Sequence, residues 1–121
     1  MSNAIPFPVT DVEQLQRWSR FLVNEGRRAP EALEPSVWAD PYPDGQMIRT
    51  IKETLANCET VADLNQTLRH YRRVEMMRIA LRDLSGLADL NESMRDLSDL
   101  ADALVGGALD WHTNALTERH G

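Results

Sequence analysis

The hydrophobic positions of this 121-residue chain recur every three or four residues over most of its length, which is the period of an α-helix. In the second half of the chain they predict two long helices, over about 60–84 and about 90–118. The first stripe comprises Val61, Leu64, Leu68, Tyr71, Met76 and Ile79. The second comprises Leu90, Met94, Leu97, Ala101, Leu104, Ala108, Trp111 and Ala115. No alternating strand pattern competes with either helix.

Start and stop signals bound both long helices. Thr60 followed by Asp63 predicts a helix start, because a threonine at the N-cap accepts a hydrogen bond from a backbone amide in the first turn. Asp89 and Glu92 frame the second start, and Gly86 between the helices predicts the stop. Two long helices joined by a short loop bury their stripes by lying antiparallel. The chain is therefore predicted to be all-α, a small bundle of about four helices.

Two shorter helices are predicted in the first half of the chain. The first begins at Thr10, which forms a capping-box pattern with Glu13, and it ends at Gly26. The second opens at Asp44. Its predicted apolar face consists of Ile48, Ile51 and Leu55.

All six prolines lie in the first third of the chain, where they predict irregular connections. The proline-rich connection 30–43 is expected to hold a single turn around residues 31–33. Residues 1–9 are interpreted as an irregular N-terminus or a remnant of expression, and residues 10–121 as a single helical domain.

The composition excludes several classes of protein. Hydrophobic residues make up 42% of the chain and charged residues 26%, which is typical of a folded domain. A formal net charge of −6 argues against a general surface for nucleic acid or for anionic membranes, because phosphates attract positive charge. No export leader or long uncharged apolar run is visible, so no membrane association and a cytoplasmic location are expected.

Charges crowd the second half of the predicted helix 60–84 on sides that should be buried. A buried unpaired charge is very costly, so these groups must find partners. One interpretation is an internal network, for example between Glu75 and Arg78 or between Arg78 and Asp83. The other is a patch that faces another domain or a phosphate, for which guanidinium groups are well suited. The candidate patch comprises Arg69, Arg72, Arg73, Glu75, Arg78, Arg82 and Asp83.

No residue is predicted to be catalytic, to bind a cofactor or to hold a metal. The chain has no Asp-x-Asp pair, no glycine-rich phosphate loop and no Gly-x-Ser-x-Gly elbow. Asp96, Asp99 and Asp102 are interpreted as a solvated helix face. Gly106 and Gly107 fall within the last helix, where they predict a kink or a close contact between helices, with the kink favoured.

Three segments resemble the family of glutamine synthetase adenylyltransferases. They are the run 68–84, with its repeated arginines and Glu75-Met76, and the shorter segments 86–90 and 97–102. The resemblance is specific over residues 64–121. It implies the helical N-terminal portion of a bifunctional enzyme that attaches AMP to glutamine synthetase and removes it by phosphorolysis, in nitrogen regulation. It also implies glutamine synthetase and the PII signalling protein as partners of that parent enzyme.

The resemblance places the chemistry outside this chain. In the family, a Gly-Lys-Leu-Gly-Gly loop and a Ser-Asp-x-Asp pair follow this region and hold magnesium and the phosphates of ATP, and neither occurs here. The resemblance therefore implies a helical segment of the adenylyl-removing half, inactive on its own and packed against the missing catalytic domains. The alternative is a stand-alone helical protein-interaction module derived from the family.

Overall fold

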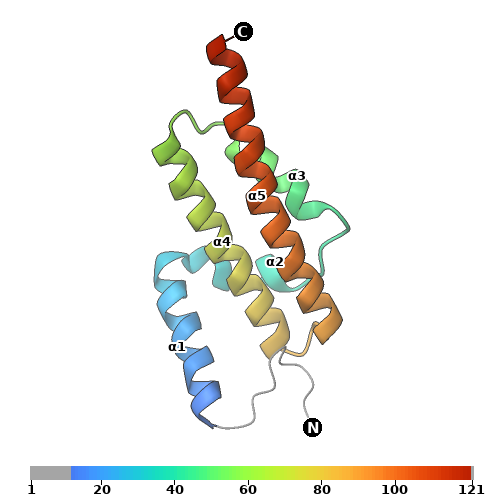
Figure 1. Cartoon of the computed structure of the whole chain (residues 1–121). Coiled ribbons are helices and arrows are strands. Elements are labelled where there is room, and N and C mark those ends of the chain that lie inside the picture. Colours follow the sequence, from blue (N-terminus) through green and yellow to red (C-terminus); the bar gives the residue numbers. More distant parts are fainter. Residues whose placement is uncertain (1–11, 121) are drawn as a thin grey trace.

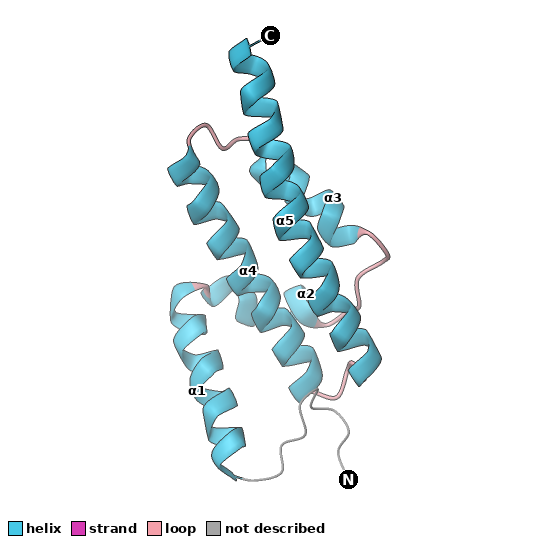
Figure 2. Cartoon of the chain, viewed as in Figure 1, coloured by secondary structure: helices cyan, strands magenta, loops and turns pink. Residues whose placement is uncertain are grey.

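The computed structural model describes residues 12–120, with side chains described over residues 20–118. The predicted cap at Thr10 lies outside the described residues, as does the segment 1–9. The described part is helical apart from short connections and is an all-α bundle, as predicted (Figure 2). Its elements are α1 (Val12–Arg28), a 3-10 helix η1 (Pro30–Leu33), α2 (Pro35–Trp38), α3 (Gln46–Leu55), α4 (Val61–Leu84) and α5 (Leu90–His120).

The two long helices lie antiparallel, which confirms the predicted pairing (Figure 1). The threonine side chain at the α4 N-cap, Thr60, accepts from the backbone amide of Asp63 at 3.0 Å. Gly86 follows the end of α4 and has φ of 77°, a left-handed conformation that favours glycine. The backbone amide of Glu92 then donates to the Asp89 side chain at 2.8 Å and starts α5. All three signals were readable in the sequence.

The main core forms where α3 packs on both long helices. Met47, Ile51 and Leu55 form the buried face of α3. The predicted face was wrong in one position, since Ile48 is 44% exposed. The predicted start at Asp44 was also early: the helix begins at Gln46, after Gly45 takes a left-handed conformation as the N-cap.

The buried face of α5 is rotated from the predicted stripe. Its fully buried positions are Ser93, Asp96, Leu100, Ala103 and Gly107. Leu97, Leu104 and Trp111 flank this face and are half-buried, as the stripe required, whereas Leu90 and Met94 are exposed. The prediction placed the largest apolar residues of α5 on its buried face. In the structure α5 contacts both α3 and α4, and small or polar side chains of α5 lie where it meets these two helices.

Gly107 is a close-contact position, which is one of the two roles predicted for the glycine pair. Helix α5 runs without a break through Gly106 and Gly107. A Cβ atom at Gly107 would lie 3.0 Å from both Ile51 Cγ1 and Leu55 Cδ1, whereas one at Gly106 would meet nothing within 4 Å. Gly107 therefore lets α3 approach α5.

The proline-rich connection is more helical than predicted. The expected turn is η1, but α2 was not foreseen, and α1 continues to Arg28 rather than ending at Gly26. Gly26 serves packing instead, because a Cβ atom there would lie 3.0 Å from Leu33 Cδ1. Helices α1 and α2 and η1 all contact α4, so they cover a side of α4 that α3 and α5 leave open.

Candidate functional site

The second half of α4 is buried on nearly all sides. Residues 77–80 and Arg82 and Asp83 are all buried, because α1, η1 and α2 cover α4 in addition to α3 and α5. The charges in this half of the helix therefore lie inside the bundle. We call Glu75, Arg78, Arg82 and Asp83, together with Glu92, Ser93 and Asp96 of α5, the charged layer.

Arg78 is the centre of the charged layer and is 0% exposed. Its Nη1 donates to Asp96 Oδ2 at 3.2 Å, and its Nη2 donates to the Asp40 carbonyl at 2.8 Å. Its guanidinium carbon lies 3.4 Å from the centroid of the Tyr42 ring, so the cation also rests on an aromatic face. These contacts join α4 to α5 and to the connection before α3.

The Tyr42 ring leads to a second buried acid, Glu75. The tyrosine hydroxyl donates to the Glu75 carboxylate, at 2.7 Å from Oε1 and 2.9 Å from Oε2. Burial raises the pKa of Glu75, while this hydrogen bond and the charge of Arg78 oppose the rise. The same carboxylate and burial raise the pKa of Tyr42, so the hydroxyl stays protonated and remains a donor.

Arg82 ties the same connection to the start of α5. Its Nε donates to Glu92 Oε2 at 2.9 Å, and its Nη2 donates to the Leu87 carbonyl at 3.1 Å. Its Nη1 donates to the carbonyls of Trp38 and Ala39, both at 3.0 Å. Every guanidinium nitrogen of Arg82 thus has an acceptor within the chain.

Asp83 is the least satisfied member of the charged layer. Neither oxygen of its buried carboxylate has a hydrogen-bond partner of acceptable geometry among the described residues, and the same holds for Ser93 Oγ. Burial raises the pKa of Asp83 to about 6; the Ser93 hydroxyl and Arg82 lower it in part, and the charges of Glu92 and Asp89 add to the rise. The Asp83 carboxylate is therefore a strained element of the interior.

The interpretation of Asp96 as a solvated residue is wrong. Its side chain is buried against Arg78, whereas Asp102 is exposed and Asp99 is half-buried. Asp96 lies one turn before Leu100 on the inner face of α5, and an arginine on the facing helix compensates its charge. Tyr42, Glu92 and Asp96 were not among the candidate residues. The run 68–84 holds more arginines than acids. This excess was the signal in the sequence that acids from elsewhere in the chain must pair with the arginines.

The seven candidate residues do not form one patch. Glu75, Arg78, Arg82 and Asp83 lie inside the bundle. The hydrogen-bond partners of the first three come from α5, from Leu87 and from residues 38–42 rather than from one another. Arg73 is half-buried, and its Nε lies 2.6 Å from Glu25 Oε2 of α1. Arg69 and Arg72 are exposed.

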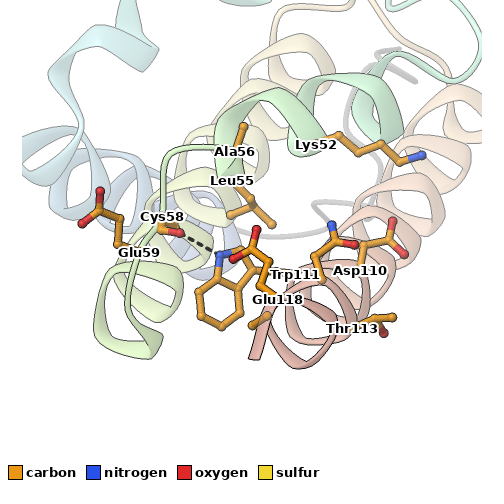
Figure 3. Close-up of a pocket in the computed structure, with 12 residues that line it drawn as sticks. Lys52, Leu55, Ala56, Cys58, Glu59, Asp110, Trp111, Thr113 and Glu118 are labelled. Atoms are coloured by element: carbon orange, nitrogen blue, oxygen red, sulfur yellow. Dashed lines mark hydrogen bonds between the residues drawn. The ribbon is translucent and has the colours of Figure 1, made fainter. Parts of the chain in front are cut away.

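Two surface hollows are candidates for ligand binding. One, of about 710 Å³, lies between the end of α3 and the second half of α5 (Figure 3). Trp111 Nε1 donates to the Cys58 carbonyl at its wall, at 2.9 Å. Its lining carries three acids, Glu59, Asp110 and Glu118, against one base, Lys52. This lining repels anions and offers no organised cation site.

The second hollow has the opposite charge. It is also about 710 Å³, and residues of α1, α3 and α4 line it together with Tyr42. Its lining includes Arg28, Arg69, His70 and Arg73, and the only acid is Glu75, to which Tyr42 donates. We call it the arginine pocket.

The residues present offer no magnesium site of the kind that the resemblance implies for the parent enzyme. Among residues 20–118, whose side chains are described, no three His, Cys, Asp or Glu side chains converge as metal ligands do. No helix within residues 12–120 is both long and apolar enough to cross a membrane.

Comparisons with known proteins give the family. The family model described as glutamate-ammonia ligase adenylyltransferase matches residues 9–121. A bifunctional glutamine synthetase adenylyltransferase/adenylyl-removing enzyme from Thioalkalivibrio sulfidiphilus (strain HL-EbGR7) is 38% identical over 103 residues, which are 85% of this chain and 11% of that enzyme. No solved structure matches. Because the family model covers nearly the whole sequence, the chain belongs to the glutamate-ammonia ligase adenylyltransferase family.

Proposed function

We propose that this chain is a non-catalytic helical segment of the adenylyl-removing half of a bifunctional enzyme that attaches AMP to glutamine synthetase and removes it. Membership of the family, and similarity to an enzyme with both activities in its name, support this parent activity. Glutamine synthetase and the PII protein are then partners of the whole enzyme, and magnesium and ATP bind outside this chain. The segment acts by packing against the remainder of the enzyme.

The outer face of α5 is the observation that carries the proposal. It presents five large hydrophobic side chains that are 52% to 62% exposed: Leu90, Met94, Val105, Leu109 and Leu116. At about 100° per residue, they fall within a sector of about 100° around the helix. We call these five residues the α5 stripe.

Between Leu90 and Glu118, the sector of the α5 stripe holds no Asp, Glu, Lys or Arg. Apart from the stripe itself, it holds only Asn91, Ser98, Ala101, Ala108 and His112. The last turns of α5 also extend beyond α3 and α4 (Figure 1). Apolar surface of this extent on a folded domain marks a contact with another surface. The remainder of the enzyme is the occupant that fits, because the similar enzyme has most of its length outside the matched 11%.

A reconstitution experiment tests the packing. The chain is mixed with the separately produced remainder of the Thioalkalivibrio enzyme, and the Kd is measured by calorimetry. We expect Met94→Glu with Leu109→Glu to weaken association at least about tenfold, since each substitution places a charge in an apolar contact. Ile48→Glu is the control, because Ile48 is also an exposed aliphatic residue, at 44%, but lies on α3 outside the α5 stripe.

The two parts of the proposal fail separately. Equal weakening by the stripe variant and by Ile48→Glu, or no association of the unmodified chain, would show that the α5 stripe is not the docking face. Transfer of AMP to or from glutamine synthetase by the purified chain alone would overturn the non-catalytic role. A stop codon directly after Gly121 in the genome would favour the stand-alone interaction module instead.

A further inference from the structure

We infer that the arginine pocket binds a small molecule that carries adjacent phosphate groups, with Arg28 and Arg69 as its ion-pair partners. No residue of α5 lines the pocket, so this inference is independent of the α5 stripe.

Two of the three arginines in the pocket have no acidic partner. Arg73 pairs with Glu25, and His70 Nε2 lies 3.5 Å from Glu31 Oε2. Arg28 and Arg69 make no ion pair or hydrogen bond with any residue whose side chain is described, and both are exposed at the pocket. Two arginines on different helices therefore line one hollow without an acidic partner among the described residues, in a chain whose net charge is −6.

The other described residues that line the pocket leave this positive charge uncancelled. The only acid in the lining is Glu75, which is buried, and the Tyr42 hydroxyl already occupies both of its oxygens. The remaining polar groups are neutral and come from Thr50 and Thr54 of α3 and from Gln66 and Thr67 of α4. An anion in this hollow would therefore find arginine side chains together with hydroxyl and amide groups in the lining.

Phosphate is the anion that this arrangement fits best. The planar guanidinium group donates two parallel hydrogen bonds to a phosphate, so two such groups suit a ligand with two adjacent phosphates. The hollow of about 710 Å³ is larger than a single phosphate requires, so it has room for a diphosphate or a nucleotide.

The test is a titration of the chain with inorganic pyrophosphate and with ATP, each without magnesium and at low salt, followed by calorimetry. We expect the Kd for pyrophosphate to rise at least about tenfold in Arg28→Ala and in Arg69→Ala. Arg72→Ala is the matched control: Arg72 is an exposed arginine on the same helix, but it does not line the pocket, so its variant should bind as the unmodified chain does.

Each outcome decides the inference. Equal Kd values for pyrophosphate and ATP show recognition of the phosphates alone, and tighter binding of ATP shows that the pocket also seats the nucleoside. Binding of neither probe overturns the inference, as does weakening by Arg72→Ala equal to that by Arg69→Ala, which would reveal attraction by general charge. Far-UV circular dichroism checks that the variants fold, which their exposed positions lead us to expect.

Discussion

The charged layer and the α5 stripe reverse the usual distribution of polar and apolar side chains. The layer buries Arg78, Arg82 and Asp96 between the two long helices, while the opposite side of α5 exposes five large hydrophobic residues. Both arginines of the layer find their partners within the chain, whereas no described residue covers the stripe. The buried arginines therefore do not point to a partner outside the chain, although Asp83 and Arg78 Nε have no hydrogen-bond partner among the described residues. The uncovered apolar surface does point to one.

The largest expected effect comes from breaking the charged layer. Arg78→Ala should lower the free energy of unfolding by about 3 to 5 kcal/mol, because it leaves Asp96 and Glu75 buried without their cation. Urea denaturation measures this, and Arg72→Ala should differ from the unmodified chain by no more than about 0.5 kcal/mol. Similar losses in the two variants would mean that the layer contributes no more than surface charge.

One residue type can be compared on the two sides of α5. Leu100 is buried in the core and Leu109 belongs to the α5 stripe. Leu100→Ala should cost about 2 to 5 kcal/mol through lost burial and the cavity that remains. Leu109→Ala should change the free energy of unfolding of the isolated chain by less than about 0.5 kcal/mol. A large loss for Leu109→Ala would show that the outer face is already covered in solution.

The neighbouring glycines Gly106 and Gly107 allow the buried and the open side of α5 to be compared by adding a methyl group to the backbone. Gly107→Ala should destabilise the chain by about 1 to 3 kcal/mol, because its Cβ would press on Ile51 and Leu55. Gly106→Ala should stabilise it by up to about 1 kcal/mol, because the new methyl group meets open space and alanine favours the helix. Thermal unfolding of both variants measures whether each substitution stabilises or destabilises the chain. A change in stability of the same sign in both variants would contradict the close contact at Gly107.

The smallest effect is a dependence of stability on pH from the charged layer. Burial raises the pKa of Asp83 from 3.8 to about 6, so the folded chain binds a proton more tightly than the unfolded chain does. Stability from this group is therefore present at low pH and lost as pH rises through about 6, which gives about 1 kcal/mol more stability at pH 5 than at pH 7.

Asp83→Asn isolates this contribution, because Glu75 and Asp96 also have raised pKa values and act in the same direction. Urea denaturation at pH 5 and pH 7 should show a smaller difference in the variant than in the unmodified chain. An equal difference would assign the pH dependence to the other acids.

The sequence predicted the framework of the fold through local signals. Thr60, Gly86 and Asp89 act on backbone groups within one turn of themselves, so their roles did not depend on distant residues. The buried face of α5 was harder to predict, because hydrophobic size pointed to Leu90 and Met94. Small residues at Ala103 and Gly107 admit a neighbouring helix, and periodicity alone does not reveal which side that neighbour takes.

The partners in the candidate site were beyond prediction from the sequence. Arg78 meets an acid 18 residues away and a carbonyl 38 residues away, and only the folded arrangement brings them together. The repeated arginines looked alike in the run 68–84, yet Arg72 is exposed while Arg78 and Arg82 are fully enclosed. The difference follows from where α2 and α5 cover α4, which is a property of the tertiary structure.

The hydrogen bonds from Arg78 and Arg82 to the carbonyls of Trp38, Ala39 and Asp40 have a consequence for proteolysis. This exposed, irregular segment has the appearance of a protease site, but a protease must draw an extended strand into its cleft. Drawing it out requires both arginines to release the backbone, so cleavage proceeds through a locally opened state. The rate of nicking within residues 38–43 therefore measures how often the interior of the bundle opens, and Arg82→Lys should speed it while the distant ends of the chain are cut as before.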